Sequence, residues 1–443
     1  MKSADALAIA DRALSVSHEG ETEAVVISTV SGLTRFADSA IHQNVYEENA
    51  SVMVRVVISD RVAGARTNQV TPNALEETVR RAVATAKMTP PDPDYPGLAP
   101  PQPVPPGGRF VDATAEATPT DRASRVRTFV EATRGLRAAG ALETEAHEIV
   151  VANSRGVRAS GHFTLTSFVA VVDGGDATGY VEASDSALDA LSMERLGERA
   201  RTKVSAGRSP RELATGQYPV ILEPAAVALM LNYLGYGTLN GKAVHEGRSY
   251  LTGRLGQRII DERLSIWDDA TDPRTVGVPF DFEGVPKRKL VLIDRGVAQT
   301  AVYDRRTAKL AGTESTGHAL PQPNAFGPVP TNLFLSTGTA SAEEMLASTD
   351  HGVLITRFHY VRIVDPVRTT ITGMTRDGTF LIEGGRIVGG VKNLRFNQSI
   401  VDTLASVEAI GAEGVLSAES FSGASWVPSL KVRAFNFSSA TTF

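Results

Sequence analysis

The chain has 443 residues, of which 42% are hydrophobic and 21% charged, and its formal net charge is -5. These values are typical of a globular protein of two or three domains, and the lack of like-charge runs argues against nucleic-acid and anionic-membrane partners. The chain contains no cysteine, which excludes disulfides, thiolate zinc ligands, iron–sulfur clusters and a cysteine nucleophile. Residues 1–12 lack the apolar core of a signal peptide, and no apolar run of about 18 residues follows, so we expect a cytoplasmic protein.

The first 88 residues are predicted to form an α/β unit. Apolar residues at helical spacing indicate a helix over residues 1–17. Thr71 is a suitable N-cap and Pro72 a suitable first residue for a second helix, which should end with this unit. Between the two helices, the Ser31-Gly32 pair is predicted to be a turn in an antiparallel meander. The strands of this meander are expected at residues 23–29, 33–37, 41–46 and 51–59.

Residues 89–108 are a proline-rich segment that holds nine of the chain's 23 prolines. Because each proline fixes its own backbone angle and lacks an N–H donor, the segment is expected to be a semi-rigid linker. A second α/β unit is predicted over residues 109–215. It should contain a helix at 121–139, strands between 147 and 183 with a hairpin turn at 153–156, and a helix at 187–205.

Residues 216–443 have long β-rich runs and few helical patterns. An apolar stretch at residues 225–241 is predicted to be a buried helix, in which Gly235 and Gly237 permit close backbone approach or a kink. The fold class is therefore predicted to be α+β, with an N-terminal α/β region of antiparallel strands and helices followed by a β-rich C-terminal domain. Hairpin turns are expected at residues 377–378 and 383–385, among strands at 218–222, 289–294, 352–365, 379–383 and 385–391.

Without cysteine, a metal ion would need His, Asp and Glu ligands. His351 and His359 have an even spacing that places both on one face of a predicted strand, but no carboxylate is evident in register with them. Adjacent His-Glu pairs lack the second histidine that a helical zinc site requires, so we interpret them as polar pairs on loops or strand ends. These pairs are His18-Glu19, His147-Glu148 and His245-Glu246.

Other catalytic motifs are also lacking. No Gly-x-Ser-x-Gly elbow occurs, since residues 423–427 lack the second glycine, and no phosphate-binding glycine loop occurs, since residues 235–237 lack the third. Asp268 and Asp269 could bind a metal or share a proton, but successive strand residues point to opposite faces. We therefore interpret this pair as a capping or turn element.

Several segments, taken in order, resemble the TldD/PmbA family of metallopeptidase-related proteins. In the metal-bearing TldD branch, the buried helix carries a His-Glu-x-x-x-His motif, and a late cysteine completes the zinc site. The resemblance places Leu231, Asn232 and Tyr236 on the motif positions. It covers almost the whole chain, through residues 51–87, 153–156, 219–224, 246–269, 279–297, 330–338 and 354–387.

The three substituted positions do not make a zinc ligand set. Leu231 cannot coordinate a metal, Asn232 is neutral and cannot be a general base, and Tyr236 is a phenol. The resemblance therefore implies the PmbA role, also called TldE: a subunit without catalytic or metal-binding residues. Such a subunit pairs with a TldD-type subunit, which holds the zinc, in a heterodimeric peptidase that acts on extended or unfolded peptides.

A β-rich domain suits such a peptide, which can be held as an added strand. The alternative interpretation of the candidate segment is a structural turn that joins two strands. The peptide-binding candidates are Thr331, Asn332, Ser336, Thr337 and Gly338.

Three other functions stay open from the sequence. The chain could be a stand-alone hydrolase that uses His245, Glu246, His318 or His351 in a site that spacing does not reveal. It could be a regulatory or binding protein, because the family is also linked to toxin maturation and gyrase modulation. It could belong to a pair that trims a peptide or amino-acid carrier from a biosynthetic intermediate. A fold built to pair with a sister subunit could also form a homodimer when alone.

Overall fold

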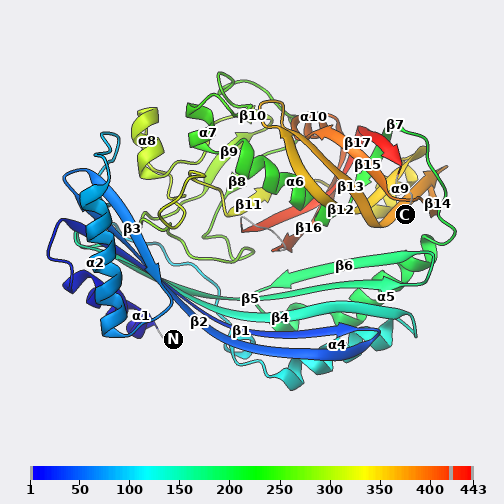
Figure 1. Ribbon diagram of the computed structural model, residues 1–443. Helices are drawn as coiled ribbons and strands as arrows, with labels where there is room; N and C mark the ends of the chain where they lie inside the picture. Colours follow the sequence, from blue (N-terminus) through cyan, green and yellow to red (C-terminus); the bar gives the residue numbers. More distant parts are fainter. Residues whose placement is uncertain (1–2, 419–422, 441–443) are drawn as a thin grey trace.

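A computed structural model describes residues 3–418 and 423–440 of the chain. Within these residues lie two β-sheets, of six and eleven strands, with helices packed against both. Figure 1 shows the first sheet as a curved layer beneath the second, with α1 (Ser3–Ser15) and α2 (Pro72–Met88) at one end of that layer. The predicted α+β fold class is confirmed. Residues 1–2 of the first predicted helix and 441–443 of the predicted β-rich domain lie outside the described part.

The first sheet is antiparallel throughout and has the strand order β3-β2-β1-β4-β5-β6. Its strands are β1 (Glu21–Ala37), β2 (Ala40–Ile58), β3 (Arg61–Thr67), β4 (Arg137–Asn153), β5 (Arg158–Asp173) and β6 (Thr178–Asp185). The further helices on this sheet are α3 (Asp112–Ala115), α4 (Pro119–Ala132), the short 3-10 helix η1 (Leu188–Ala190) and α5 (Met193–Ala206).

Both faces of the first sheet are buried over much of its length. On one face, α1 and α2 pack against one end of the sheet, and α4 and α5 pack against the other. The opposite face carries Val25, Ile149 and Val151, which pack against Val278 and Phe280 of the C-terminal region. The sheet is thus the layer on which the C-terminal region rests.

The two predicted N-terminal units share this sheet, because β1 of the first unit pairs with β4 of the second from Glu23 to Phe36. Hydrogen bonds between strands therefore cross the predicted boundary between the units. The division of the chain into domains and a linker at residues 88, 108 and 215 stays a prediction.

The turn predicted at Ser31-Gly32 is wrong, because both residues lie inside the continuous strand β1. The glycine serves another purpose. A Cβ atom at position 32 would lie 2.3 Å from the Nη1 atom of Arg122. That guanidinium is buried against the strand and donates hydrogen bonds to Thr34 Oγ1 at 3.2 Å and Thr144 Oγ1 at 3.1 Å. Gly32 therefore marks the space that a buried arginine occupies.

Local signals placed several elements correctly. The Thr71 hydroxyl accepts a hydrogen bond from Ala74 N–H at 3.4 Å at the start of α2, as predicted. The hairpin turn at residues 153–156 is also confirmed. The helix predicted to reach residue 139 instead ends at Ala132, because Arg134 and Gly135 have φ values of 52° and 85°. Positive φ values end a right-handed helix, and β4 begins two residues later. The next predicted helix starts late, since α5 begins at residue 193.

The proline-rich segment has no helix or strand in the range 89–108, as its composition predicts. It is nevertheless packed against the sheet rather than spanning solvent. Tyr95 and Leu98 are buried in contact with Val57 of β2. The segment that was predicted to be a linker thus covers one end of the sheet.

The second sheet contains a closed ring of strands. β17 pairs with both β15 and β7, so that β7, β12, β13, β15 and β17 close on themselves. The strands of this sheet are β7 (Gly216–Leu222), β8 (Ile266–Asp268), β9 (Leu290–Asp294), β10 (Val297–Ala298), β11 (Asn332–Leu335), β12 (His351–Asp365), β13 (Thr370–Glu383), β14 (Arg386–Gly390), β15 (Leu394–Ser399), β16 (Val407–Ser417) and β17 (Ala424–Ala440). The helices of this region are α6 (Pro224–Gly237), α7 (Gly241–His245), α8 (Arg305–Ala311), α9 (Ala342–Ala347) and α10 (Ile400–Ala405).

The hairpin turn predicted at Asp377-Gly378 is wrong, because both residues lie within β13. Their φ values of 52° and 133° belong to a bulge, where the register with β12 shifts. The Asp377 carboxylate there accepts hydrogen bonds from the Arg357 guanidinium. The turn predicted at residues 383–385 is confirmed between β13 and β14. No helix of the described residues is long and apolar enough to cross a membrane.

Candidate functional site

Helix α6 carries the positions where the family resemblance expects a metal motif. It begins with proline at its first position, and most of its side chains are buried, as predicted for this stretch, although the helix ends at Gly237 rather than at residue 241. Leu231 is 3% exposed and Asn232 2% exposed, and Leu231 belongs to the apolar core that includes strands of the closed ring. Tyr236 is only partly buried, with its ring centroid 5.9 Å from that of Phe326.

These three side chains do not fit a zinc ion. Leu231 has no donor atom, and an amide and a phenol do not replace the imidazole, carboxylate and thiolate groups that zinc prefers. Gly235 serves packing, because a Cβ atom there would lie 2.9 Å from Leu333 Cδ1 of β11. In the parts of the chain that the structure describes, no group of three or more His, Cys, Asp or Glu side chains is arranged to hold a metal ion.

A buried polar cluster lies where β8 meets β11. The Oδ1 atom of Asp268 lies 3.0 Å from the Nε2 atom of His318, and both side chains are fully buried. The other carboxylate oxygen of Asp268 accepts a hydrogen bond from the Asn332 N–H at 2.7 Å. The turn role predicted for Asp268 is therefore wrong, because this residue ends β8 and faces inward. Asp269 does act in a turn, since its carboxylate accepts hydrogen bonds from the N–H and hydroxyl of Thr271.

Lys287 and Asn332 complete this cluster. The Lys287 ammonium donates to the Thr331 hydroxyl and, at 3.2 Å, to Asn332 Oδ1. The Asn332 amide nitrogen donates to Thr275 Oγ1 at 2.9 Å and to the Val276 carbonyl at 2.7 Å. Every hydrogen-bonding atom of the Asn332 side chain is thus engaged by neighbouring protein groups.

The charges of the cluster follow from burial and from its pairing. Burial acts to raise the pKa of Asp268, but the charges of His318 and Lys287 outweigh it and hold that pKa at about 2. Burial lowers the pKa of His318 below its usual range, and Asp268 only partly offsets this effect. Burial also lowers the pKa of Lys287. The pairing therefore keeps Asp268 ionised, although burial disfavours the charged forms of all three side chains.

Both nitrogens of the His318 imidazole lie beside protein groups. Its Nε2 faces Asp268, and its Nδ1 lies 2.9 Å from Thr316 Oγ1. A general base needs a nitrogen within reach of the substrate proton, and here one ring nitrogen faces a carboxylate and the other a hydroxyl. The cluster forms part of a cavity wall.

That cavity has a volume of about 310 Å³ and lies between the first sheet and the C-terminal region. Its sides are apolar where Phe163 of β5 faces Val278 and Phe280. Lys287 and His318 form part of its polar wall. A cavity of this size and lining can admit a mainly apolar side chain.

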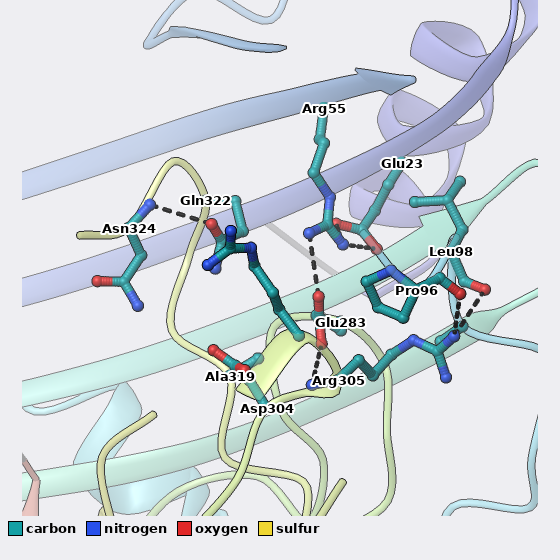
Figure 2. A network of polar contacts seen from close by, with 12 residues as sticks. Glu23, Arg55, Pro96, Leu98, Glu283, Asp304, Arg305, Ala319, Gln322 and Asn324 are labelled. Carbon is teal, nitrogen blue, oxygen red and sulfur yellow. Dashed lines mark hydrogen bonds and ion pairs between the residues drawn. The ribbon is translucent and has the colours of Figure 1, made fainter. Parts of the chain in front are cut away.

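A second buried network joins the first sheet to the C-terminal region (Figure 2). The Arg55 guanidinium on β2 lies 2.8 Å from Glu23 of β1 and 3.0 Å from Glu283. The second oxygen of Glu283 accepts from the N–H of Arg305, the first residue of α8. The Arg305 side chain in turn donates to carbonyl oxygens of the proline-rich segment, among them Pro96 at 3.2 Å. This network ties three parts of the chain together.

The predicted His-Glu pairs have separate neighbours. His147 stacks on Phe163 with ring centroids 4.5 Å apart, whereas Glu148 accepts a hydrogen bond from Ser3. Glu19 and Glu246 form ion pairs with Lys87 and Arg248, respectively. The ring of His351 contacts the ring of Tyr218, and the ring of His359 contacts that of Tyr360.

The peptide-binding candidates lie at the start of strand β11 and in the segment that follows it. Thr331 and Asn332 line the cavity of about 310 Å³. Ser336 lies farther along the chain, where its N–H donates to Ser265 at 3.0 Å, and the Gly338 N–H donates to Gly411 at 2.8 Å. Thr337 is exposed. Whether these residues contact a peptide stays a prediction.

Sequence reasoning named His318 without its partner, and it missed Lys287 and Arg55. Lys287 shows one usable signal, since it opens a run of three cations, residues 287–289, that follows Asp281 and Glu283 closely. Arg55 shows one as well, because it is a charged residue within the otherwise apolar run of residues 52–58 in β2. In both cases the partners are far away in the sequence, so spacing alone could not pair them.

Comparison with known proteins finds two family domains. Residues 22–86 match PmbA/TldA metallopeptidase domain 1, and residues 215–439 match the PmbA/TldA metallopeptidase C-terminal domain. The metalloprotease PmbA of Escherichia coli O157:H7 is 23% identical over 432 residues, which are 92% of this chain and 91% of that protein. A metalloprotease TldD homolog of Buchnera aphidicola subsp. Acyrthosiphon pisum (strain APS) is 28% identical over 207 residues, 46% of this chain and 42% of that protein.

The crystal structure of TldE from Thermococcus kodakarensis superposes with a TM-score of 0.88 at 21% identity, covering 98% of this chain and 99% of that one. At this identity the likeness shows the fold. The chain spans less than half the length of the first curated relatives that it matches, 42% and 47%. The matched domains nevertheless define a metallopeptidase-related protein. The chain belongs to the PmbA/TldD family, as the sequence resemblance indicated.

Proposed function

We propose that this chain is the subunit without a metal site in a two-subunit zinc peptidase, and that its partner is a TldD-type subunit. The observation that carries the proposal is the burial and chemistry of the side chains on α6. Leu231, on the first motif position, is part of the apolar core, and Asn232 beside it is buried as well. Here the helix supports the core, so the zinc ion and its ligands belong to the partner.

The buried pair of Asp268 and His318 supports the same proposal. It resembles an acid–base pair, yet both ring nitrogens face protein groups. A stand-alone hydrolase that uses His318 would need this ring to turn, and the turn would leave a buried carboxylate without its partner. Such a loss is strongly unfavourable in a fully buried pair.

The substrate of the pair is an extended or unfolded peptide. Thr331 lies at the polar wall of the cavity of about 310 Å³ and is partly exposed, so its hydroxyl can reach a guest side chain. Asn332 is fixed by Thr275 and Val276 and serves to position Thr331. The apolar wall at Phe163 and Phe280 favours an aliphatic or aromatic peptide side chain.

Reconstitution tests this proposal. The chain is co-expressed with a family member of similar length that carries His-Glu-x-x-x-His and a late cysteine, and cleavage of an unfolded peptide is measured. We expect the two chains to co-purify and the pair to cleave. Replacing the glutamate of the partner's motif by glutamine should abolish cleavage, whereas Tyr236→Phe in this chain should leave it unchanged. Cleavage by this chain alone, or its loss in the Tyr236→Phe variant, would refute the proposal.

A further inference from the structure

Three lysines in the described part of the chain are buried, and one of them differs from the other two in its surroundings. Lys203 forms an ion pair with Glu223, and the Lys431 ammonium lies 3.4 Å from Glu408. Lys287 is only 4% exposed, yet no carboxylate oxygen of the described residues lies within 4.0 Å of its Nζ atom. A buried cation is normally paired, because leaving water without a partner is unfavourable. Lys287 therefore lacks the partner that its burial calls for.

The nearby acids are engaged by other groups. Asp268 and Asp281 act on the charge of Lys287, but from beyond 4.0 Å. The Asp268 carboxylate faces His318 and accepts a hydrogen bond from the Asn332 N–H. The Asp281 carboxylate accepts hydrogen bonds from three backbone N–H groups. Neither acid can turn toward the lysine without losing these hydrogen bonds.

The ammonium group of Lys287 also has a hydrogen-bond donor to spare. One of its three N–H bonds is accepted by Thr331 Oγ1, and a second, at 3.2 Å, by Asn332 Oδ1. The third has no acceptor among the described residues. All three residues line the cavity of about 310 Å³. The spare donor therefore lies at the wall of this cavity.

The other walls of the cavity decide what can reach this donor. Phe163 and Phe280 make them mainly apolar. Glu145 also lines the cavity, but it lies 3.5 Å from Nε2 of His147. Such a cavity accepts an apolar side chain, and Lys287 adds one cation at its wall. A residue that carries both an apolar side chain and a free carboxylate matches both features, and within a peptide only the last residue does so.

We propose that Lys287 binds the carboxylate at the C-terminus of a peptide whose last residue is apolar. The last side chain packs against Phe163 and Phe280, and the carboxylate accepts the spare N–H of Lys287. A hydrogen bond between charged groups is stronger than one between neutral groups, and a surrounding of low dielectric strengthens it further. An acidic side chain within a longer peptide carries the same group, but it offers little apolar surface to these walls.

This inference rests on the proposed function and narrows its substrate from an extended peptide to a peptide held by its free C-terminal end. Binding to the purified chain alone tests it, with no partner subunit present. The probe is acetyl-Ala-Ala-Ala-Phe with a free carboxylate, compared by calorimetry with the same peptide as its C-terminal amide. We expect the acid to bind about tenfold more tightly than the amide. Acetyl-Ala-Ala-Ala-Glu amide, which carries its carboxylate on a side chain, should bind no better than the phenylalanine amide.

Two substitutions locate the effect. Lys287→Met removes the charge and keeps a side chain of similar length. Lys289→Met is the matched control, because Lys289 is two residues further on, exposed, and 4.8 Å from the ring centroid of Trp267. The preference for the acid should vanish in the first variant and persist in the second. Thermal melting shows whether both variants fold, and the peptide comparison in the parent chain needs neither of them.

Equal binding of the acid and the amide by the parent chain overturns the inference, and so does a preference that persists in Lys287→Met. Tight binding of the glutamate amide overturns it in favour of an acidic side chain. The outcome is separate from that of the reconstitution. A pair that cleaves, although this chain binds acid and amide alike, defeats the present inference alone. A chain that prefers the acid but forms no cleaving pair defeats the proposed function alone.

Discussion

Arg55 and Glu283 lie 228 residues apart in the sequence, and their side chains meet at 3.0 Å in the interior. The same guanidinium also binds Glu23, so one arginine joins two strands of the first sheet to the C-terminal region. The two carboxylates share this cation at exposures of 2% and 5% of their side chains. One side chain therefore adds a charged link between the two layers to the apolar contacts of Val25, Ile149 and Val151 with the C-terminal region.

Replacing Arg55 by methionine should lower the free energy of unfolding by about 3–5 kcal/mol, because it leaves buried carboxylates without their partner. Guanidinium chloride unfolding measures the change. Arg80→Met is the matched control, since Arg80 pairs with Glu76 and Glu77 on the surface and its side chain is 64% exposed. That variant should change stability by less than about 1 kcal/mol. Equal effects of the two substitutions would contradict the role of the network.

The same network predicts a pH dependence through Glu23. Burial raises the pKa of Glu23 from 4.5 to about 7, although Arg55 acts in the opposite direction. The folded state then binds more protons than the unfolded state between these two values. Stability should therefore fall as the pH rises from about 4.5 to 7 and level off above it.

Glu23→Gln should remove this slope, because glutamine does not titrate. The measurement is the free energy of unfolding at several pH values, for the parent chain and the variant. The slope due to Glu23 amounts to at most about 3 kcal/mol over the window. A parent chain whose advantage over the variant grows as the pH rises would show that Glu23 is ionised throughout.

The contribution of Asp268 to stability should change with pH in the opposite sense. Its pKa is lowered to about 2, so its contribution to stability is present above about 3.8 and is lost as the pH falls toward 2. Asp268→Asn should cost about 2 kcal/mol at neutral pH, and the difference from the parent should shrink in acid. Glu76→Gln, at a side chain that is 55% exposed, is the control and should show no such trend. A cost that is the same at pH 7 and at acid pH would show that Asp268 acts through packing alone.

Gly32 and Arg122 should be energetically coupled. Gly32→Ala places a methyl group 2.3 Å from the Arg122 guanidinium, and we expect a loss of about 1–3 kcal/mol. In an Arg122→Ala background the same substitution should cost almost nothing, because the space is then empty. A double-mutant cycle by chemical unfolding measures this coupling. Costs that simply add would mean that Gly32 is needed for another reason.

The success of the sequence predictions depended on the range of the interactions involved. The cap at Thr71 and the turn at residues 153–156 are set by neighbouring residues, and both were predicted. From the sequence, Gly32 looks like a turn glycine. In the structure it lies in an extended strand, and a glycine is needed there because the side chain of Arg122, from helix α4, fills the adjacent space. Asp377 likewise looked like a turn residue, whereas its partner Arg357 lies across a strand pair.

The candidate site divides in the same way. That Leu231 cannot be a metal ligand could be recognised from residue identity, because a leucine side chain has no donor atom in any environment. Two contacts could not be predicted, because each joins segments tens of residues apart in the sequence. They are the pairing of Asp268 with His318 and the hydrogen bond from Lys287 to Asn332. Spacing rules describe faces of one helix or strand, and these contacts form only when separate strands and loops pack together.

The metal content of this chain tests the central claim most directly. The purified chain, loaded with excess zinc and then dialysed, is analysed for bound zinc and for chelator-sensitive cleavage of an unfolded peptide. We predict far less than one zinc ion per chain and no chelator-sensitive cleavage, because Leu231, Asn232 and Tyr236 do not form a ligand set. Stoichiometric zinc together with cleavage that a chelator abolishes would contradict the account.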